Sequence, residues 1–193
     1  MSREIALQPI PIDTESFAPF GQLIAPDEDG ASFGPGDAQL VLSNGMPRLY
    51  IMRLRSRGLA FDRITRPVRV TQCLAAMGNA EWLPAVAPPL APEDLAAMPD
   101  PASIKAFRIS GALGIKLHRG TWHAGPFFDA PTMDFLNLEL ADTNEVDHVN
   151  CHLARDHGVS FRFEGPQNLG GGAAAIIDSA RPADPATLRA GLG

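Results

Sequence analysis

Hydrophobic and polar residues alternate along this chain over short stretches, a pattern typical of β-strands that are buried on one face. Residues 68–77, VRVTQCLAAM, form the strongest such run in the first half of the chain. Residues 108–140 predict a strand, a glycine turn, a strand at 114–118, a polar loop and a strand at 133–140. The same alternation predicts further strands, at residues 22–25, 48–55, 81–87, 103–109 and 159–163.

Helices are expected to be few and short. Asp13 or Thr14 can cap a helix that ends by Phe20, and residues 92–98 can form two helical turns. Eighteen glycines and eighteen prolines favour corners over long helices. The pattern therefore predicts a mainly β fold, an antiparallel β-barrel or jelly roll with a few short helices. We expect one such domain over residues 1–164, and a tail or arm rich in glycine, alanine and proline at 165–193.

Composition narrows the classes of function. The net charge is −6 and the chain has no basic stripe, so we expect no nucleic-acid partner. No apolar run approaches the ~20 residues needed to cross a bilayer, and the N-terminal segment lacks the pattern of a secretory signal. We interpret Cys73 and Cys151 as inert thiols in a reducing compartment. These features predict a cytoplasmic protein that does not bind membranes.

Residues 118–123, HRGTWH, bring two imidazoles, a guanidinium and an indole together. Histidine exchanges protons near neutral pH, which suits acid–base catalysis. We predict that His118 and His123 are the catalytic acid and base, in either order. The alternative for each is a structural histidine that is hydrogen-bonded to the backbone.

Residues 108–140 resemble the ureidoglycolate lyase family, also called ureidoglycolate hydrolase. The likeness rests on the run G-x-x-x-H-R-x-x-W-H from Gly114 to His123 and on D-F-L at residues 134–136. It extends more weakly to residues 11–21 and to Thr71-Gln72, and covers about residues 8–155. The resemblance implies a cupin-like β-barrel, usually a homodimer. It also implies a lyase acting on a C–N bond, which splits ureidoglycolate into glyoxylate and urea in purine and allantoin degradation.

One early strand departs from the family pattern. The family usually reads E-R-H-P-x-G-T-Q where this chain has T-R-P-V-R-V-T-Q at residues 65–72, so the acid and the histidine are missing. Cationic side chains repel a divalent ion, and we therefore expect no cofactor and no tightly held metal. A weak divalent metal site at His118 and His123 is the alternative. The histidines at 148, 152 and 157, with Cys151, match no zinc spacing well.

The implied substrate is a small carboxylate, and a guanidinium pairs bidentately with a carboxylate. We hypothesise that Arg66, Arg69, Lys116 or Arg119 holds this group. The alternative for each is a solvated surface charge.

Other polar residues near the cluster are candidates for substrate binding. We predict that Gln72, Asp134 and Asn137 bind the ureido group or orient an imidazole. Trp122 is expected to form a wall of the pocket. Glu139 is a candidate general base, although its place at the end of a strand favours solvent exposure.

The departures from the family pattern leave a second function open. A divergent cupin could bind or transform another small carboxylate, with or without a metal and with or without catalysis. A fold does not by itself determine a function. Release of glyoxylate from ureidoglycolate separates the two functions.

Overall fold

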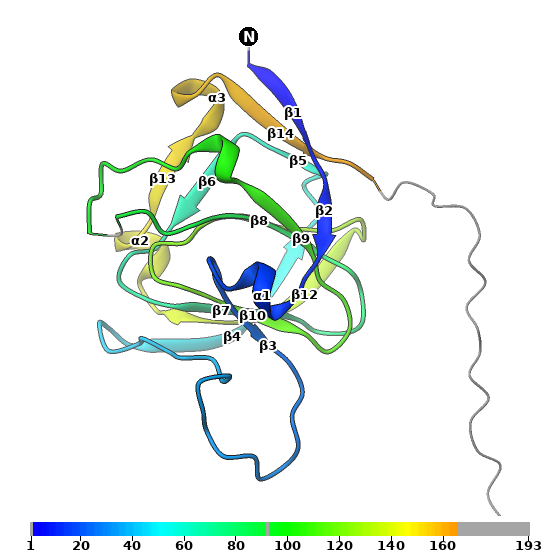
Figure 1. Ribbon diagram of the computed structural model, residues 1–193, viewed down its shortest axis with the longest axis vertical. Helices are drawn as coiled ribbons and strands as arrows, with labels where there is room; N and C mark the ends of the chain where they lie inside the picture. Colours follow the sequence, from blue (N-terminus) through cyan, green and yellow to red (C-terminus); the bar gives the residue numbers. More distant parts are fainter. Residues whose placement is uncertain (1, 92, 166–193) are drawn as a thin grey trace, which may run out of the picture.

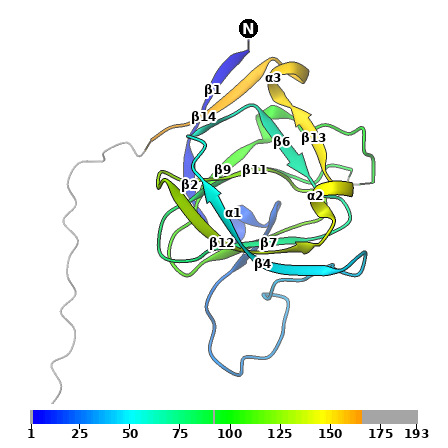
Figure 2. The same cartoon turned by 180° about the vertical axis from the view of Figure 1, so that it is seen from behind.

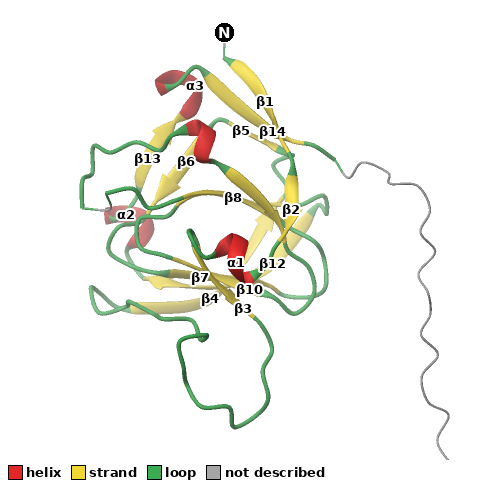
Figure 3. Cartoon of the chain, in the orientation of Figure 1, coloured by secondary structure: helices red, strands yellow, loops and turns green. Residues whose placement is uncertain are grey.

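Residues 2–91 and 93–165, which a computed structural model describes, fold into three β-sheets with short helices between the strands (Figures 1 and 3). The five-stranded sheet has the order β3 (Gly21–Ile24), β10 (Gly114–Leu117), β7 (Gln72–Ala76), β12 (Thr132–Leu140) and β4 (Pro47–Arg55). The six-stranded sheet has the order β13 (Val149–His152), β6 (Arg63–Arg66), β11 (Trp122–Phe127), β8 (Leu83–Ala87), β9 (Lys105–Arg108) and β2 (Pro9–Pro11). A small third sheet contains β1 (Arg3–Leu7), β14 (Val159–Phe163) and β5 (Ala60–Phe61).

The two larger sheets face each other, as views from opposite sides show (Figures 1 and 2). Nearly all neighbouring strands are antiparallel, and β1 with β14 and β2 with β9 are parallel pairs. The arrangement is mainly β, as the alternation predicts, and it is compatible with a jelly roll or with the cupin-like fold that the family resemblance implies. The sheets do not form a closed barrel among the described residues.

Helical segments in the described chain are one turn long: α1 (Thr14–Phe17), α2 (Thr143–Val146), α3 (Leu153–Asp156) and the 3-10 turn η1 (Pro101–Ser103). The predicted cap of α1 is confirmed, because the Asp13 carboxylate accepts the Ser16 amide at 2.9 Å. No helix in residues 2–91 or 93–165 has the length and apolar content needed to span a membrane. The predicted tail, apart from Gly165, lies outside the described residues.

The predicted helix at 92–98 is not present over its described part, residues 93–98, which forms isolated turns. The backbone carbonyls of Leu90, Asp94 and Ala97 accept hydrogen bonds from the Arg66 guanidinium. The Arg66 side chain, from β6, therefore satisfies carbonyl groups that a helix would satisfy with its own amides.

The strand predicted at 68–77 begins only at Gln72. The amides of Val68 and Arg69 donate to the Asp147 carboxylate at 2.8 Å each, and the Thr71 amide donates to the Val41 carbonyl. Because these amides are used by a loop and a side chain, residues 67–71 form a corner between β6 and β7. This corner carries the chain from the six-stranded to the five-stranded sheet.

Candidate active site

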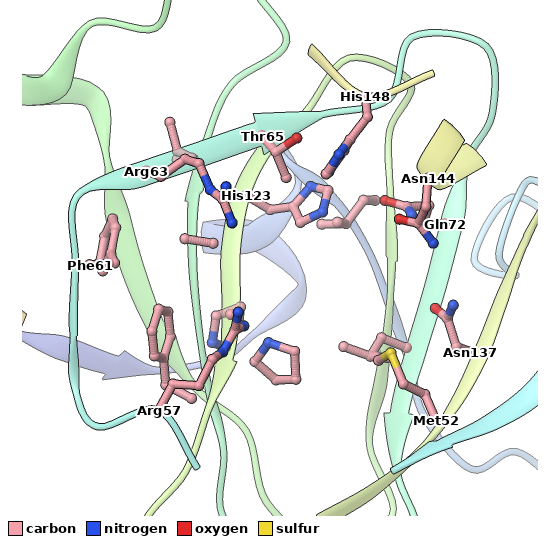
Figure 4. A pocket seen from close by; sticks show the side chains of 18 of the residues that line it. Met52, Arg57, Phe61, Arg63, Thr65, Gln72, His123, Asn137, Asn144 and His148 are labelled. Carbon is pink, nitrogen blue, oxygen red and sulfur yellow. The ribbon is translucent and has the colours of Figure 1, made fainter. Parts of the chain in front are cut away.

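A cavity of about 480 Å³ lies between the two larger sheets. The five-stranded sheet contributes Tyr50, Gln72, Asn137 and Glu139, and the six-stranded sheet contributes residues such as Thr65 and His123. His148 reaches the cavity from the residue before β13 (Figure 4). Apolar side chains, among them Leu74, Ile115 and Leu117, form the rest of the wall. A mostly apolar cavity with a few convergent polar groups is the usual form of a small-molecule site.

Glu139 is the centre of a hydrogen-bond network on one side of the cavity. Its side chain is 2% exposed, so the expectation of solvent exposure at this strand end is wrong. Glu139 Oε1 accepts the Tyr50 hydroxyl at 3.0 Å and Asn144 Nδ2 at 3.2 Å, and Oε2 accepts Gln72 Nε2 at 2.8 Å. A carboxylate has about four acceptor positions, so these three donors leave about one free, on Oε2.

Gln72 has an unused acceptor beside this carboxylate. Its Nε2 donates to Glu139, and its Oε1 is buried without a hydrogen-bond partner among the described residues. A buried polar atom without a partner costs free energy, which a ligand with an N–H donor would recover. Gln72 and Glu139 therefore line the same cavity, each with an acceptor position that no described residue uses.

His123 is held in one tautomer by the backbone. Its Nδ1 lies 3.2 Å from the Thr121 carbonyl oxygen, and because a carbonyl only accepts, Nδ1 carries the proton. Nε2 is then left with a lone pair. Burial lowers the pKa of His123 to about 4, an effect that the hydrogen bond to Thr121 partly opposes. The ring is therefore neutral at pH 7 and can accept a proton.

His148 faces the same space, and Figure 4 shows its ring beside that of His123. Burial lowers the pKa of His148, and the positive charge of Arg63 lowers it further. The preceding residue, Asp147, is buried and accepts the two amides of the 67–71 corner. This double hydrogen bond anchors the backbone that carries His148.

The structure does not bring His118 and His123 together. His118 follows β10, and its ring bonds to Lys116 Nζ at 3.0 Å and to the Ala18 carbonyl at 3.1 Å, away from the cavity lining. His123 lies in β11, because residues 122–127 form a strand where a polar loop is predicted. Lys116, 3% exposed, points to the same side as His118, while its neighbours Ile115 and Leu117 line the cavity.

Arg66 and Trp122 lie beside the cavity but do not line it. Both are fully buried, and the Arg66 guanidinium lies over the Trp122 ring at 4.8 Å. The expectation that Trp122 forms a pocket wall is wrong, because its ring packs in the core with residues such as Ile64 and Phe161. Arg66 instead anchors the backbone at Leu90, Asp94 and Ala97.

Three further predicted substrate-binding residues have other partners and are absent from the cavity lining. Arg69 donates to the Asn44 carbonyl, and Arg119 donates to the Val68 carbonyl at 2.8 Å. Asp134 forms a bidentate ion pair with Arg53 at 2.8 Å on the outer face of the sheet. Of the ten residues predicted for the site, the structure places Gln72, His123 and Asn137 in the cavity.

Several cavity residues were not predicted from sequence: Arg57, Arg63, Tyr50 and Asn144, with His148 considered only as part of a faint metal set. Tyr50 lies opposite Asn137 in the pairing of β4 with β12, so the alternation of β4 was a usable signal for its inward direction. His148 and Asn144 lie in irregular segments, where periodicity carries no such signal.

Among residues 2–91 and 93–165 no group of three or more histidine, cysteine, aspartate or glutamate side chains could hold a metal ion. His123, Glu139 and His148 all line the cavity, but they do not form such a group. Gln72, which donates to Glu139, adds only a neutral amide, and an amide is a weak metal ligand.

Stability is expected to fall in mild acid because of His123. Its pKa is lowered from 6.5 to about 4 in the folded chain, so between these values the unfolded chain binds more protons. Stability therefore rises with pH across this window and is lost as the pH falls. At pH 4.5 this term amounts to about 2 kcal/mol.

Urea unfolding at pH 4.5 and pH 7 measures this effect. His123→Asn should make the loss of unfolding free energy between these pH values about 2 kcal/mol smaller. An unchanged pH dependence would show that the ring is not neutral and buried in the folded chain.

A family model described as ureidoglycolate lyase matches residues 41–157 of the chain. The matched region contains every side chain named above as part of the cavity. No match is found among curated proteins.

Proposed function

The chain belongs to the ureidoglycolate lyase family, and on this premise we propose that it splits ureidoglycolate into glyoxylate and urea in the cavity between its two larger sheets. The substrate carries a ureido group, a hydroxyl and a carboxylate on a two-carbon unit. Its small size fits a cavity of about 480 Å³.

The Gln72 and Glu139 acceptors suit the ureido end of the substrate. A ureido group presents N–H donors side by side, and the buried Gln72 Oε1 and the free position on Glu139 Oε2 can accept two of them. Asn137 lies on the same face of β12 as Glu139 and offers an amide to the ureido carbonyl. The observation that supports the proposal most strongly is this pair of unused acceptor positions, on side chains that line the same cavity as the neutral His123 imidazole.

His123 is the proposed base. Its Nε2 takes the hydroxyl proton, the O–H electron pair forms the aldehyde C=O bond, and the C–N bond breaks. The bonding pair remains on the ureido nitrogen, which takes the proton back from His123 and leaves as urea. Proton and electrons balance, so the step needs no oxidant and no added water.

We assign to His148 the role of second catalytic histidine that the sequence suggested for His118, because His148 lines the cavity and His118 does not. A neutral imidazole can donate an N–H hydrogen bond. We assign this donor to the charge that develops on the leaving urea. Since burial and Arg63 both lower the pKa of His148, the ring is suited to donate a hydrogen bond rather than to carry a charge.

The test is an assay of purified protein with racemic ureidoglycolate, in which glyoxylate and urea are both measured with and without EDTA. Equal release of the two products in both conditions is expected. Release that stops in EDTA would overturn the metal-free mechanism. Absence of release with any added divalent metal, together with binding of another small acid, would support a divergent cupin of different function.

We also propose that the protein is a homodimer through the outer face of the five-stranded sheet. Leu49 and Ile51 on β4 are 64% and 59% exposed, and they lie opposite Leu138 and Leu136 of β12 on this face. A contiguous apolar face on an edge strand is typical of an interface. A second copy could cover it.

Ile51→Lys is expected to convert the dimer to monomer, because it places a charge at the centre of the apolar face. Light scattering after size exclusion measures the mass. Arg55→Lys, which keeps the charge near the end of the same strand, is the matched control. A mass of one chain for the unaltered protein would contradict the proposal.

A further inference from the structure

Two arginines that the sequence did not single out line the cavity: Arg57 and Arg63. Arg57 belongs to the short link between β4 and β5, and Arg63 begins β6. Figure 4 shows both side chains on the side of the cavity opposite Gln72 and Asn144, with the His123 ring between the two sides. The cavity therefore has a cationic side and an amide–carboxylate side.

Both guanidiniums are available for a ligand. Arg57 and Arg63 are solvent-exposed, and within the described part of the chain neither forms an ion pair or a side-chain hydrogen bond. Several other arginines of the described chain do have a carboxylate partner, such as Arg53 with Asp134 and Arg162 with Glu4. Among the described arginines without a carboxylate partner, Arg57 and Arg63 are the two that line the cavity.

The backbone positions both side chains. The Ser56 amide donates to the Pro131 carbonyl and its hydroxyl to the Phe128 carbonyl, which fixes the start of the Arg57 link. Arg63 directly precedes the buried Ile64 on β6 and is held by the pairing of that strand with β13. The two guanidiniums therefore start from anchored backbone on two different segments.

The negative groups in the same lining are Asp62 and Glu139. Glu139 is engaged by three donors on the other side of the cavity. Asp62 is exposed and forms no ion pair with either arginine. Two like charges that face one space repel, and a carboxylate placed between them removes this repulsion while it accepts bidentate hydrogen bonds.

We propose that Arg57 and Arg63 bind the carboxylate of the substrate and thereby set its orientation, with the carboxylate on the arginine side and the uncharged end on the Gln72–Glu139 side. These residues replace Arg66, Arg69, Lys116 and Arg119, which have other partners, as the carboxylate site. The choice of ligand rests on the proposed function. The preference of the cavity for a carboxylate is tested separately, by binding measurements that do not depend on catalysis.

Binding of glycolate, a small hydroxy-carboxylate, and of glycolamide, its uncharged amide, tests the proposal by calorimetry or by the fluorescence of Trp82, which lines the cavity. Arg57→Met and Arg63→Met should each weaken glycolate binding by about 10- to 100-fold and change glycolamide binding less than about twofold. Arg55→Met is the matched control, because Arg55 is exposed, lies two residues before Arg57 in the sequence and does not line the cavity. It should leave both affinities unchanged.

Glycolate affinity that is unchanged in both variants, or equally reduced in Arg55→Met, would overturn the assignment. So would a failure of the unaltered protein to bind glycolate at millimolar concentration. Failure of the proposed function has a different signature, namely glycolate binding that depends on Arg57 and Arg63 without any glyoxylate release from ureidoglycolate.

Discussion

His123→Asn is expected to lower kcat for glyoxylate release by about 1,000-fold, because general acid–base catalysis contributes roughly 10²–10⁴. Asparagine can still donate to the Thr121 carbonyl through its amide, but it has no basic nitrogen in place of Nε2. KM should change little, since the proposed binding groups are Gln72, Glu139 and the two arginines. Steady-state assays at pH 7.5 give both constants.

His118→Asn is the comparison for this result. The His118 ring contacts Lys116 and the Ala18 carbonyl and does not line the cavity, so its loss should change kcat by less than about threefold. A thousandfold loss in His118→Asn with near-normal rates in His123→Asn would reverse the assignment of the base. Circular dichroism of both variants separates a catalytic loss from unfolding.

The second large effect is on stability: Arg66→Met should lower the unfolding free energy by about 3–5 kcal/mol. The guanidinium is fully buried, donates to the carbonyls of Leu90, Asp94 and Ala97, and lies over Trp122. Methionine fills a similar volume but leaves the carbonyls of Leu90 and Ala97 without their donor, while the Asp94 carbonyl keeps only the Ala97 amide. The turns at residues 93–97 then lose their hydrogen bonds to β6.

Urea unfolding measures the Arg66 effect, and Arg155→Met is the matched control. Arg155 is exposed, and within the described residues it pairs only with the adjacent Asp156, so its replacement should cost less than about 1 kcal/mol. A loss below about 1 kcal/mol for Arg66→Met would show that the loop does not depend on this guanidinium.

The regular parts of the fold could be predicted from alternation alone. The strands at β4, β12 and β14 match their predicted ranges within one residue, because each is half-buried and alternates. The corner at residues 67–71 could not be predicted, since it depends on Asp147, almost eighty residues later in the sequence. Likewise the turns at 93–98 depend on Arg66 rather than on local preference.

The candidate site was predictable only in part, for a related reason. Gln72, His123 and Asn137 lie on strands, and all three reach the cavity. His118 and His123 are close in sequence, but residues 118–121 connect two different sheets and send the rings to different sides. The burial of Glu139 could not be predicted, because it depends on three hydrogen-bond donors that come from β4, β7 and the start of α2.

The most direct measurement is a crystal structure of His123→Asn with ureidoglycolate bound, since this variant should hold the substrate without converting it. The account predicts that the ureido N–H groups donate to Gln72 Oε1 and Glu139 Oε2, that the carboxylate lies between Arg57 and Arg63, and that the hydroxyl faces residue 123. A ligand bound on the Lys116–His118 side of the sheet, with the cavity free of substrate, would contradict it.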